Sequence, residues 1–148
     1  MPDAALLRVD LGSADCAGAL RDGVAGADAV LHLAGSLKAY DQRGFDAVNA
    51  EGTARLVAAV AASAEDAHFV LVSSLAAAGP STDGRGSDAP PERCRPVSRY
   101  GESKRRGELA LVASPLARTI VRPPVVYGPG DGATRLLFQQ AIAPVTAV

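Results

Sequence analysis

Short apolar runs alternate with helix-like segments along the chain, and this alternation limits the fold more than any other feature of the sequence. Four runs have the length and apolar content of buried strands: 5–11, 28–35, 68–74 and 117–122. Four other segments show the apolar spacing of helices: 13–26, 45–64, 98–113 and 133–142. Strands that alternate with helices predict βαβ units, and therefore an α/β fold with a parallel sheet covered on both faces.

Composition places the chain among ordinary globular proteins. Its 148 residues suffice for one domain with a core, 48% of them are hydrophobic, and the net charge is −1. No run approaches the roughly 18–20 apolar residues that cross a bilayer, and the first ten residues lack the features of a secretory signal. We therefore expect a cytoplasmic protein that binds neither nucleic acid nor membrane.

The cysteines and histidines give no sign of a metal site. Cys16 and Cys94 lie far apart with no CxxC pattern, which predicts two reduced thiols. His32 and His68 each fall on a predicted strand rather than in a cluster of ligands. No metal is expected.

Small and polar residues follow each predicted strand at the end where ligands of parallel sheets gather. These strand ends are Asp10-Leu11, Ala34-Gly35, Ser73-Ser74 and Arg122-Pro123-Pro124. The long segment 79–97 is rich in Gly, Pro and Ser, and it has the composition of either a lid over such a site or a linker.

Tyr100 and Lys104 are spaced to share one face of the predicted helix 98–113. The chain has thirteen arginines but only two lysines, so a lysine at this place is notable. An ammonium near a phenol lowers the phenol's pKa from its ordinary value near 10, which makes it a usable proton donor or acceptor. The alternative is a boundary tyrosine followed by a solvated lysine.

Ser74 and Asn49 strengthen the catalytic interpretation. Ser74 closes a strand about 25 residues before Tyr100, where its hydroxyl could stand beside the phenol; a serine that only satisfies backbone groups is the alternative. Asn49 is the one asparagine of the chain and lies on or beside the apolar stripe of its helix, one turn before Gly52. Its amide needs partners there, in a site or in a structural bridge.

These residues belong to a set of motifs that resembles the extended short-chain dehydrogenase/reductase group, also called the NAD-dependent epimerase/dehydratase family. The matching segments run in family order: VDL (9–11), VLHLAG (30–35), VNAEGT (48–53), FVLVSSLAAAG (69–79), YGESK (100–104) and RPPVVYGPGD (122–131). The resemblance covers nearly the whole chain.

The resemblance implies a site for NAD or NADP and a small-molecule alcohol or carbonyl substrate. By it, Tyr100 is the general acid/base, Lys104 tunes its pKa and anchors the cofactor ribose, Ser74 polarises the substrate oxygen, and Asn49 supports the site. The cofactor would contact these two residues of the helix and six others: Asp10, Leu11, Ala34, Gly35, Pro124 and Val125. Hydride would pass between the nicotinamide and a carbinol or carbonyl carbon.

The family's glycine-rich GxxGxxG turn is missing from the sequence. The GxxG of 23–26 precedes a strand, which is the wrong context for holding a pyrophosphate at a helix N-terminus. The resemblance therefore implies a partial doubly wound, Rossmann-like sheet that lacks its first βαβ unit, over residues 1–148, with the C-terminal substrate domain absent. Three explanations stay open: a piece of a longer enzyme or a mis-assigned start, a compact four-stranded sheet in which 5–11 pairs with 28–35, or a second polypeptide that supplies the missing half.

The resemblance to the family also limits the class of substrate, and it leaves a second class of function open. Nucleotide-sugar members usually carry an asparagine where this chain has Val125, which favours smaller or more apolar carbonyl compounds. The alternative to an oxidoreductase or epimerase is a non-catalytic binding or regulatory module, or an inactive fragment of such an enzyme. Helices 45–64 and 98–113 are the expected surfaces of a homodimer, because the family often pairs there.

Overall fold

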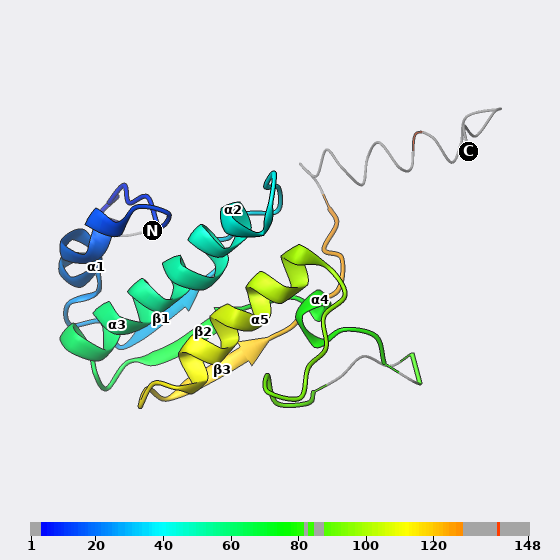
Figure 1. Ribbon diagram of the computed structural model, residues 1–148. Helices are drawn as coiled ribbons and strands as arrows, with labels where there is room; N and C mark the ends of the chain where they lie inside the picture. Colours follow the sequence, from blue (N-terminus) through cyan, green and yellow to red (C-terminus); the bar gives the residue numbers. More distant parts are fainter. Residues whose placement is uncertain (1–3, 82, 85–87, 129–138, 140–148) are drawn as a thin grey trace.

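Three parallel strands form the sheet at the centre of the fold (Figure 1). The computed structural model describes residues 4–81, 83–84, 88–128 and 139. The strands are β1 (Ala29–His32), β2 (His68–Val72) and β3 (Arg118–Val121), in the order β1-β2-β3. Phe69 of the central strand stands opposite Val30 on one side and Arg118 on the other.

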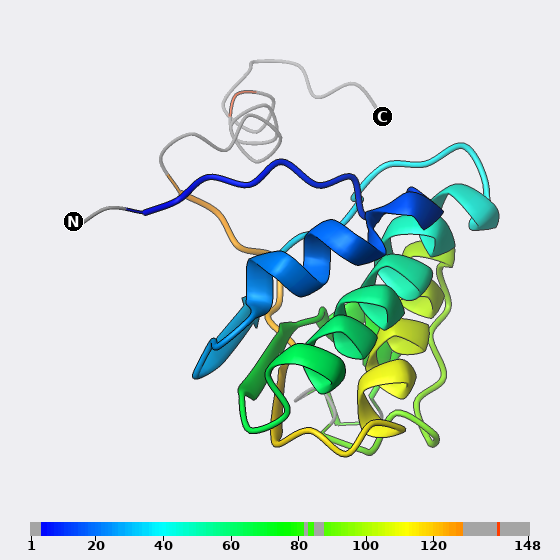
Figure 2. The same ribbon diagram turned by 90° about the vertical axis from the view of Figure 1, so that its left-hand side faces the viewer.

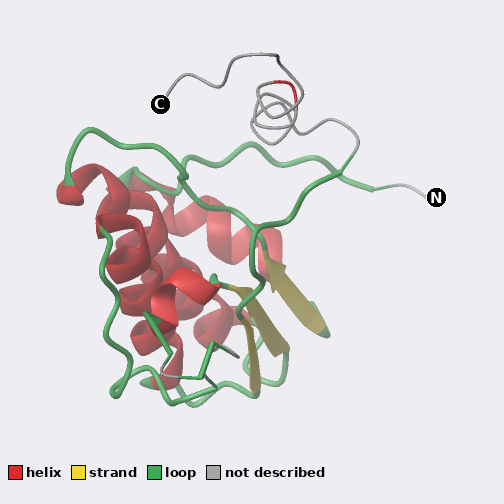
Figure 3. Cartoon of the chain, turned by 90° about the vertical axis from the view of Figure 1, so that its right-hand side faces the viewer, coloured by secondary structure: helices red, strands yellow, loops and turns green. Residues whose placement is uncertain are grey.

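Seven helical segments connect and cover these strands. They are η1 (Ala14–Cys16), α1 (Ala17–Val24), α2 (Gln42–Asp46), the π-helical η2 (Ala47–Gly52), α3 (Thr53–Ser63), α4 (Leu75–Ala78) and α5 (Arg99–Val112). α3 and α5 lie side by side over one face of the sheet (Figure 1). Turned views show the main helices as one layer and the strands as the other (Figures 2 and 3).

Short polar side chains fix where several helical segments begin. Each accepts a hydrogen bond from a backbone N–H of the first turn, which otherwise has no partner: Ser13, Asp41, Ser74 and Ser98. Pro115 follows α5 within three residues of its end, where a proline is tolerated because the helix has stopped. The polypeptide therefore enters η1, α2, α4 and α5 at positions that the sequence marks.

The core lies between the central strand and the helix layer. Phe69 and Leu71 of β2 are buried on the face that α3 and α5 cover. They join a cluster with Val60 of α3, Leu111 of α5 and Leu116 of the turn that follows it. Burying side chains of this size stabilises the fold by about 1.5–3 kcal/mol each.

Two glycines let α5 pack closely against its neighbours. A Cβ on Gly107 would clash with the carbonyl oxygen of Asn49, and a Cβ on Gly101 would clash with the carbonyl oxygen of Ala76. The backbone of α5 therefore touches η2 on one side and α4 on the other. This close approach brings the start of α5 to the carboxyl ends of the strands.

The predicted strand 5–11 is wrong. Residues 4–10 have no regular secondary structure, and Leu6 is 92% exposed. The segment instead runs beside α1, where Leu7 approaches Gly23, while Leu11 packs on Gly52. An apolar run becomes a strand only when a neighbouring strand pairs with it, and the sheet of the described residues has β1 as its edge. The four-stranded alternative is thereby excluded.

The other predicted elements in the described part of the chain are confirmed with shifted ends. The helix predicted over 45–64 begins earlier, at Gln42, and contains the π-helical turn. The short α4 was not predicted, because LAAA is too brief to show periodicity. The helix predicted over 133–142 lies outside the described residues, apart from residue 139. The homodimer through 45–64 and 98–113 stays a prediction.

The expectation that helices cover both faces of the sheet holds for one face only in the described part of the chain. On the other face, Leu31 is 65% exposed, and Val121 is also exposed. Figure 3 shows this side of the strands without a helix layer among the described residues. None of the described helices is long and apolar enough to span a membrane.

Replacing Gly107 by alanine tests the close packing of α5. The new methyl group would push against the Asn49 carbonyl, so we expect a loss of about 1–3 kcal/mol in the free energy of unfolding, measured by urea denaturation. Gly18→Ala in α1 is the matched control, because a Cβ there meets nothing within 4 Å. That variant should be neutral or more stable by up to about 1 kcal/mol. Equal effects at the two positions would contradict the packing described above.

Candidate active site

Lys104 reaches from α5 to the carboxyl end of the central strand. Its Nζ donates a hydrogen bond to the carbonyl oxygen of Val72 at 2.9 Å, and the residue is only 5% exposed. Burial lowers the pKa of Lys104, and the nearby Glu108 carboxylate partly opposes that shift. The buried ammonium group thus binds a strand carbonyl that lies two residues before Ser74 in the sequence.

Tyr100 and Ser74 line the same cavity at this edge of the sheet. Tyr100 lies one turn before Lys104 in α5, and its ring packs edge-on against Phe45 with 6.1 Å between ring centroids. The Ser74 Oγ accepts a hydrogen bond from the N–H of Ala76 at the start of α4, which leaves its proton available to a ligand. Both residues therefore line one cavity, and their pairing in catalysis stays a prediction.

The cavity has a volume of about 750 Å³, which is within the usual range for small-molecule sites. Its hydroxyl groups come from Ser73, Ser74 and Tyr100. The rest of its lining is aliphatic and comes from three separate segments: Leu37, Leu75-Ala76 and 123–126. A backbone bond from the N–H of Leu75 to the carbonyl of Pro123, at 3.0 Å, joins two of these walls.

Asn49 ties the chain after β1 to helix α5. Its Oδ1 accepts from the N–H of Ser36 at 2.7 Å, while its Nδ2 donates to the Ser36 carbonyl at 3.0 Å and to Ser103 Oγ at 2.9 Å. Asn49 lies in the π-helical turn, where one extra residue per turn moves the side chains relative to a regular helix. The amide is buried with its hydrogen-bonding groups paired, so its role here is positional.

His32, the last residue of β1, extends this hydrogen-bond network. The Thr53 hydroxyl donates to the Asn49 carbonyl at 2.8 Å, so it accepts from His32 Nε2, which lies 2.9 Å away. Burial, with a further contribution from the Lys104 charge, lowers the pKa of His32 to about 4. His32 is therefore neutral at pH 7.

A buried ion pair that sequence reasoning missed holds the walls of the cavity together. The Glu108 carboxylate is fully buried on α5 and binds Arg122, with Nε–Oε1 and Nη2–Oε2 distances of 2.9 and 2.6 Å. Ser73 donates to the same carboxylate at 2.5 Å, and Arg122 Nη1 donates to the Ala89 carbonyl at 2.8 Å. The only sequence signal was the spacing, since Glu108 follows Lys104 by one turn and Arg122 ends a strand.

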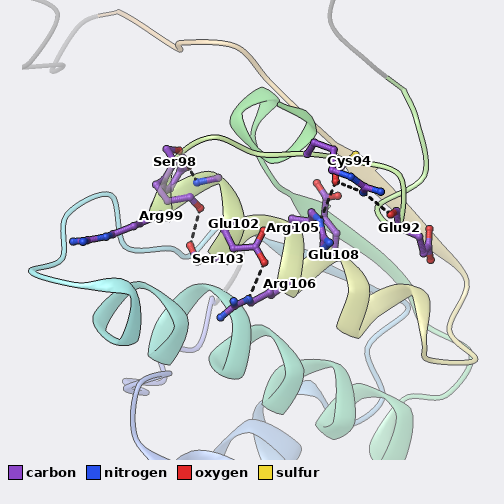
Figure 4. A network of polar contacts seen from close by, with 12 residues as sticks. Glu92, Cys94, Ser98, Arg99, Glu102, Ser103, Arg105, Arg106 and Glu108 are labelled. Carbon is purple, nitrogen blue, oxygen red and sulfur yellow. Dashed lines mark hydrogen bonds and ion pairs between the residues drawn. The ribbon is translucent and has the colours of Figure 1, made fainter. Parts of the chain in front are cut away.

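The outer side of α5 carries further polar contacts that anchor the segment before it (Figure 4). Arg105 Nε donates to the carbonyl of Cys94 at 3.3 Å, so the chain before the helix is fastened onto it. Glu102 accepts from Arg106, which also pairs with Asp46 at the end of α2. Cys94 and Cys16 are both free thiols, as predicted.

The predicted cofactor residues divide into two groups. Ala34, Gly35, Pro124 and Val125 follow β1 and β3 at the carboxyl edge, as expected. A Cβ on Gly35 would lie 3.1 Å from Asn49 Oδ1 and 3.5 Å from Lys104 Nζ, so an added side chain would crowd the Asn49 amide and touch the ammonium group. These four residues and the catalytic candidates share one edge of the sheet.

Asp10 and Leu11 do not follow a strand, contrary to the prediction. Asp10 Oδ1 accepts from the N–H of Gly12 at 2.8 Å, and the Leu11 carbonyl accepts from Arg55. Leu11 rests on Gly52, one turn from Asn49. The side chain that was expected near an adenine ring therefore caps its own turn. Among the described residues there is no cluster of three or more metal-ligating side chains.

A parallel α/β sheet with hydroxyl groups and a buried ammonium group at its carboxyl edge defines a Rossmann-like domain with its ligand site at that edge. The chain belongs to the NAD dependent epimerase/dehydratase family, which it matches over residues 2–145.

Proteins from several bacteria are similar to this chain in sequence or in fold. A ceramide reductase of Caulobacter vibrioides is 44% identical over 124 residues, which cover 83% of this chain and 34% of that protein. A putative epimerase of Burkholderia cenocepacia has a TM-score of 0.73 at 32% identity, over 93% of this chain and 46% of that one. The dTDP-glucose 4,6-dehydratase DesIV of Streptomyces venezuelae, with NAD bound, has a TM-score of 0.67 at 25% identity, over 81% of this chain and 38% of that one. The chain thus spans less than half the length of these relatives.

The residues present fit one half of a nicotinamide dinucleotide. The open backbone at Gly35, the ammonium group of Lys104 and the phenol of Tyr100 suit a ribose and a nicotinamide ring. The sequence has no GxxGxxG turn to hold the pyrophosphate. The fit therefore concerns the reacting end of the cofactor.

Removing the charge of Glu108 tests the buried ion pair. Glu108→Gln leaves the Arg122 guanidinium without its counter-charge, and we expect a loss of about 3–5 kcal/mol in the free energy of unfolding by urea titration. The matched control is Glu51→Gln, which breaks an exposed pair with Arg55 and should cost about 0–1 kcal/mol. A Glu108→Gln protein as stable as the control would show that the pair does not join these elements.

His32 makes stability fall with decreasing pH. The unfolded histidine takes up its proton near pH 6.5, whereas the folded one does so near pH 4, so the unfolded state binds more protons between these values. We expect the contribution of His32 to the free energy of unfolding to be fully present above pH 6.5 and to decline by about 3 kcal/mol by pH 4. Urea denaturation midpoints measured across this pH range should depend less on pH in His32→Gln than in the unaltered chain. The exposed His68→Gln is the control, and a loss of the pH dependence there instead would contradict the assignment.

Proposed function

We propose that this chain carries the hydride-transfer site of an NAD(P)-dependent oxidoreductase in which Tyr100 is the general acid/base. The observation that supports it best is the shared cavity of Ser74 and Tyr100 at the strand end where the Lys104 ammonium group is buried. The two hydroxyl groups line the cavity and the ammonium group binds the adjacent strand end, which supports a site for carbonyl chemistry.

Each residue has a distinct role in the proposed reaction. Ser74 donates a hydrogen bond to the substrate oxygen, because its own oxygen already accepts from Ala76. Tyr100 gives its proton to that oxygen during reduction, or removes it during oxidation. Lys104 places a positive charge near the phenol and offers donors to a ribose, while Asn49 holds the flanking segment in place.

The atoms and electrons of the proposed step balance. A bound NADH or NADPH supplies a hydride, which is its ordinary chemistry. In reduction the carbonyl carbon gains that hydride and its oxygen gains the Tyr100 proton, so the C=O bond becomes CH–OH. The phenolate is then neutralised by a proton from solvent.

Reduction is the direction that we favour, with a small-molecule ketone as substrate and its alcohol as product. The curated relative with 44% identity is named a reductase, whereas the structural relatives are named epimerase and dehydratase. The relative's name shows that a reductase contains a segment similar to this chain.

A non-catalytic binding module is the second candidate. The missing GxxGxxG turn favours it, because a domain without a pyrophosphate site has less hold on a dinucleotide. The two candidates differ in whether the Tyr100 hydroxyl matters, and one substitution separates them.

Tyr100→Phe removes the proton donor and keeps the ring against Phe45. We expect ketone-dependent oxidation of NADH to fall by about 10²–10⁴-fold, measured by absorbance with NADH raised until the rate no longer increases. Tyr40→Phe is the control, because Tyr40 is fully exposed and lies outside the cavity. Equal rates in both variants, or no turnover by the unaltered chain with NADH or NADPH, would contradict the oxidoreductase and favour the binding module.

A further inference from the structure

The lining of the cavity combines two kinds of chemistry. Hydroxyl groups come from Ser73, Ser74 and Tyr100, and the other lining residues are aliphatic. Among the described residues, no charged side chain lines the cavity. A ligand that fills it therefore has one polar group and a larger apolar part.

Aliphatic side chains also stand in solvent at the mouth of the cavity. Leu37 is 76% exposed, and Val125 and Val126 are similarly exposed, although these segments are almost ninety residues apart in the sequence. A branched apolar side chain that stays in water does not contribute the stabilising free energy that its burial would give. Groups of such exposed side chains often mark binding surfaces. Both segments line the same cavity, so one apolar ligand could cover both.

The cationic and amide groups closest to the cavity are already engaged within the protein. Lys104 donates to Val72, and Asn49 bonds Ser36 and Ser103. Arg122 holds the Glu108 carboxylate. A phosphate needs charged donors in its site, and none of the described residues that line the cavity is charged.

We infer that the substrate is a ketone, or its secondary alcohol, on a long aliphatic chain, with the oxygen at Ser74 and Tyr100 and the chain along Leu37 and Val126. This inference rests on the proposed function for the role of the oxygen. It adds the chemical class of the substrate, which follows from the lining and exposure of the cavity.

A series of methyl ketones of increasing chain length tests the inference by binding alone, without cofactor. Each ketone, kept below its solubility limit, is titrated into the full chain by calorimetry. We expect the affinity to rise about fourfold per added methylene, the amount that burial of one CH₂ contributes, until the cavity and its mouth are filled. A flat series, or tighter binding of a dTDP-sugar than of any ketone, would overturn the inference.

Two matched pairs of substitutions locate the binding. Leu37→Asp and Val126→Asp place a charge at the mouth and should weaken the longest ketones at least tenfold while the shortest change little. Leu31→Asp, on the open sheet face, and Val97→Asp, 83% exposed, lie outside the cavity and should leave the series unchanged. All four positions are exposed, and circular dichroism verifies that each variant is folded. Weakening by Leu31→Asp alone would move the binding to the open sheet face and refute the site.

The outcome also separates this inference from the proposed function. If Tyr100→Phe abolishes turnover but affinity does not increase with chain length, the oxidoreductase stands and the substrate class is wrong. If affinity increases with chain length and Tyr100→Phe leaves turnover unchanged, the apolar ligand stands and the catalytic proposal fails.

Discussion

The arrangement of the site depends on the hydrogen bonds and the ion pair that the fully buried Glu108 carboxylate makes with Ser73 and Arg122. This carboxylate joins helix α5 to the ends of two strands, because Ser73 and Arg122 both bind it and each directly precedes a segment that lines the cavity. The same helix carries Tyr100 and Lys104. One charge-assisted cluster therefore sets the positions of the hydroxyl groups and of the aliphatic wall together, and the low dielectric of the interior makes each of its bonds costly to lose.

Sequence reasoning located most of the fold and brought the candidate residues to one end of the sheet, while their roles stay predictions. The i,i+4 spacing of Tyr100 and Lys104 and the place of Ser74 after a strand were sufficient, because helix and strand periodicities determine which side chains share a face or an edge. The Glu108 cluster could not be found in this way. Its members are 14 and 35 residues apart, and a charged residue in a helix is ordinarily expected in solvent.

The errors have a common physical origin in partners that a local pattern does not reveal. The run 5–11 has the composition of a strand, yet a strand needs hydrogen bonds from a neighbour, and the described sheet provides none beyond β1. The expected cover on both faces likewise depended on segments beyond the described helices. Asp10 does not follow a strand as expected, and its Oδ1 accepts from the N–H of Gly12 two residues away, while its contact with a cofactor stays a prediction.

The π-helical turn at Ala47–Gly52 makes the position of Asn49 dependent on the exact length of that segment. In a regular helix successive side chains are about 100° apart, so the deletion of one residue before the turn's end would rotate everything on one side of it by that angle relative to the other. The amide would then leave either Ser36 or Ser103, and the loop after β1 would lose its attachment to α5. Sequence length in this stretch is thus as restricted as residue identity, and homologous chains that keep the asparagine should tolerate substitutions there far better than insertions or deletions.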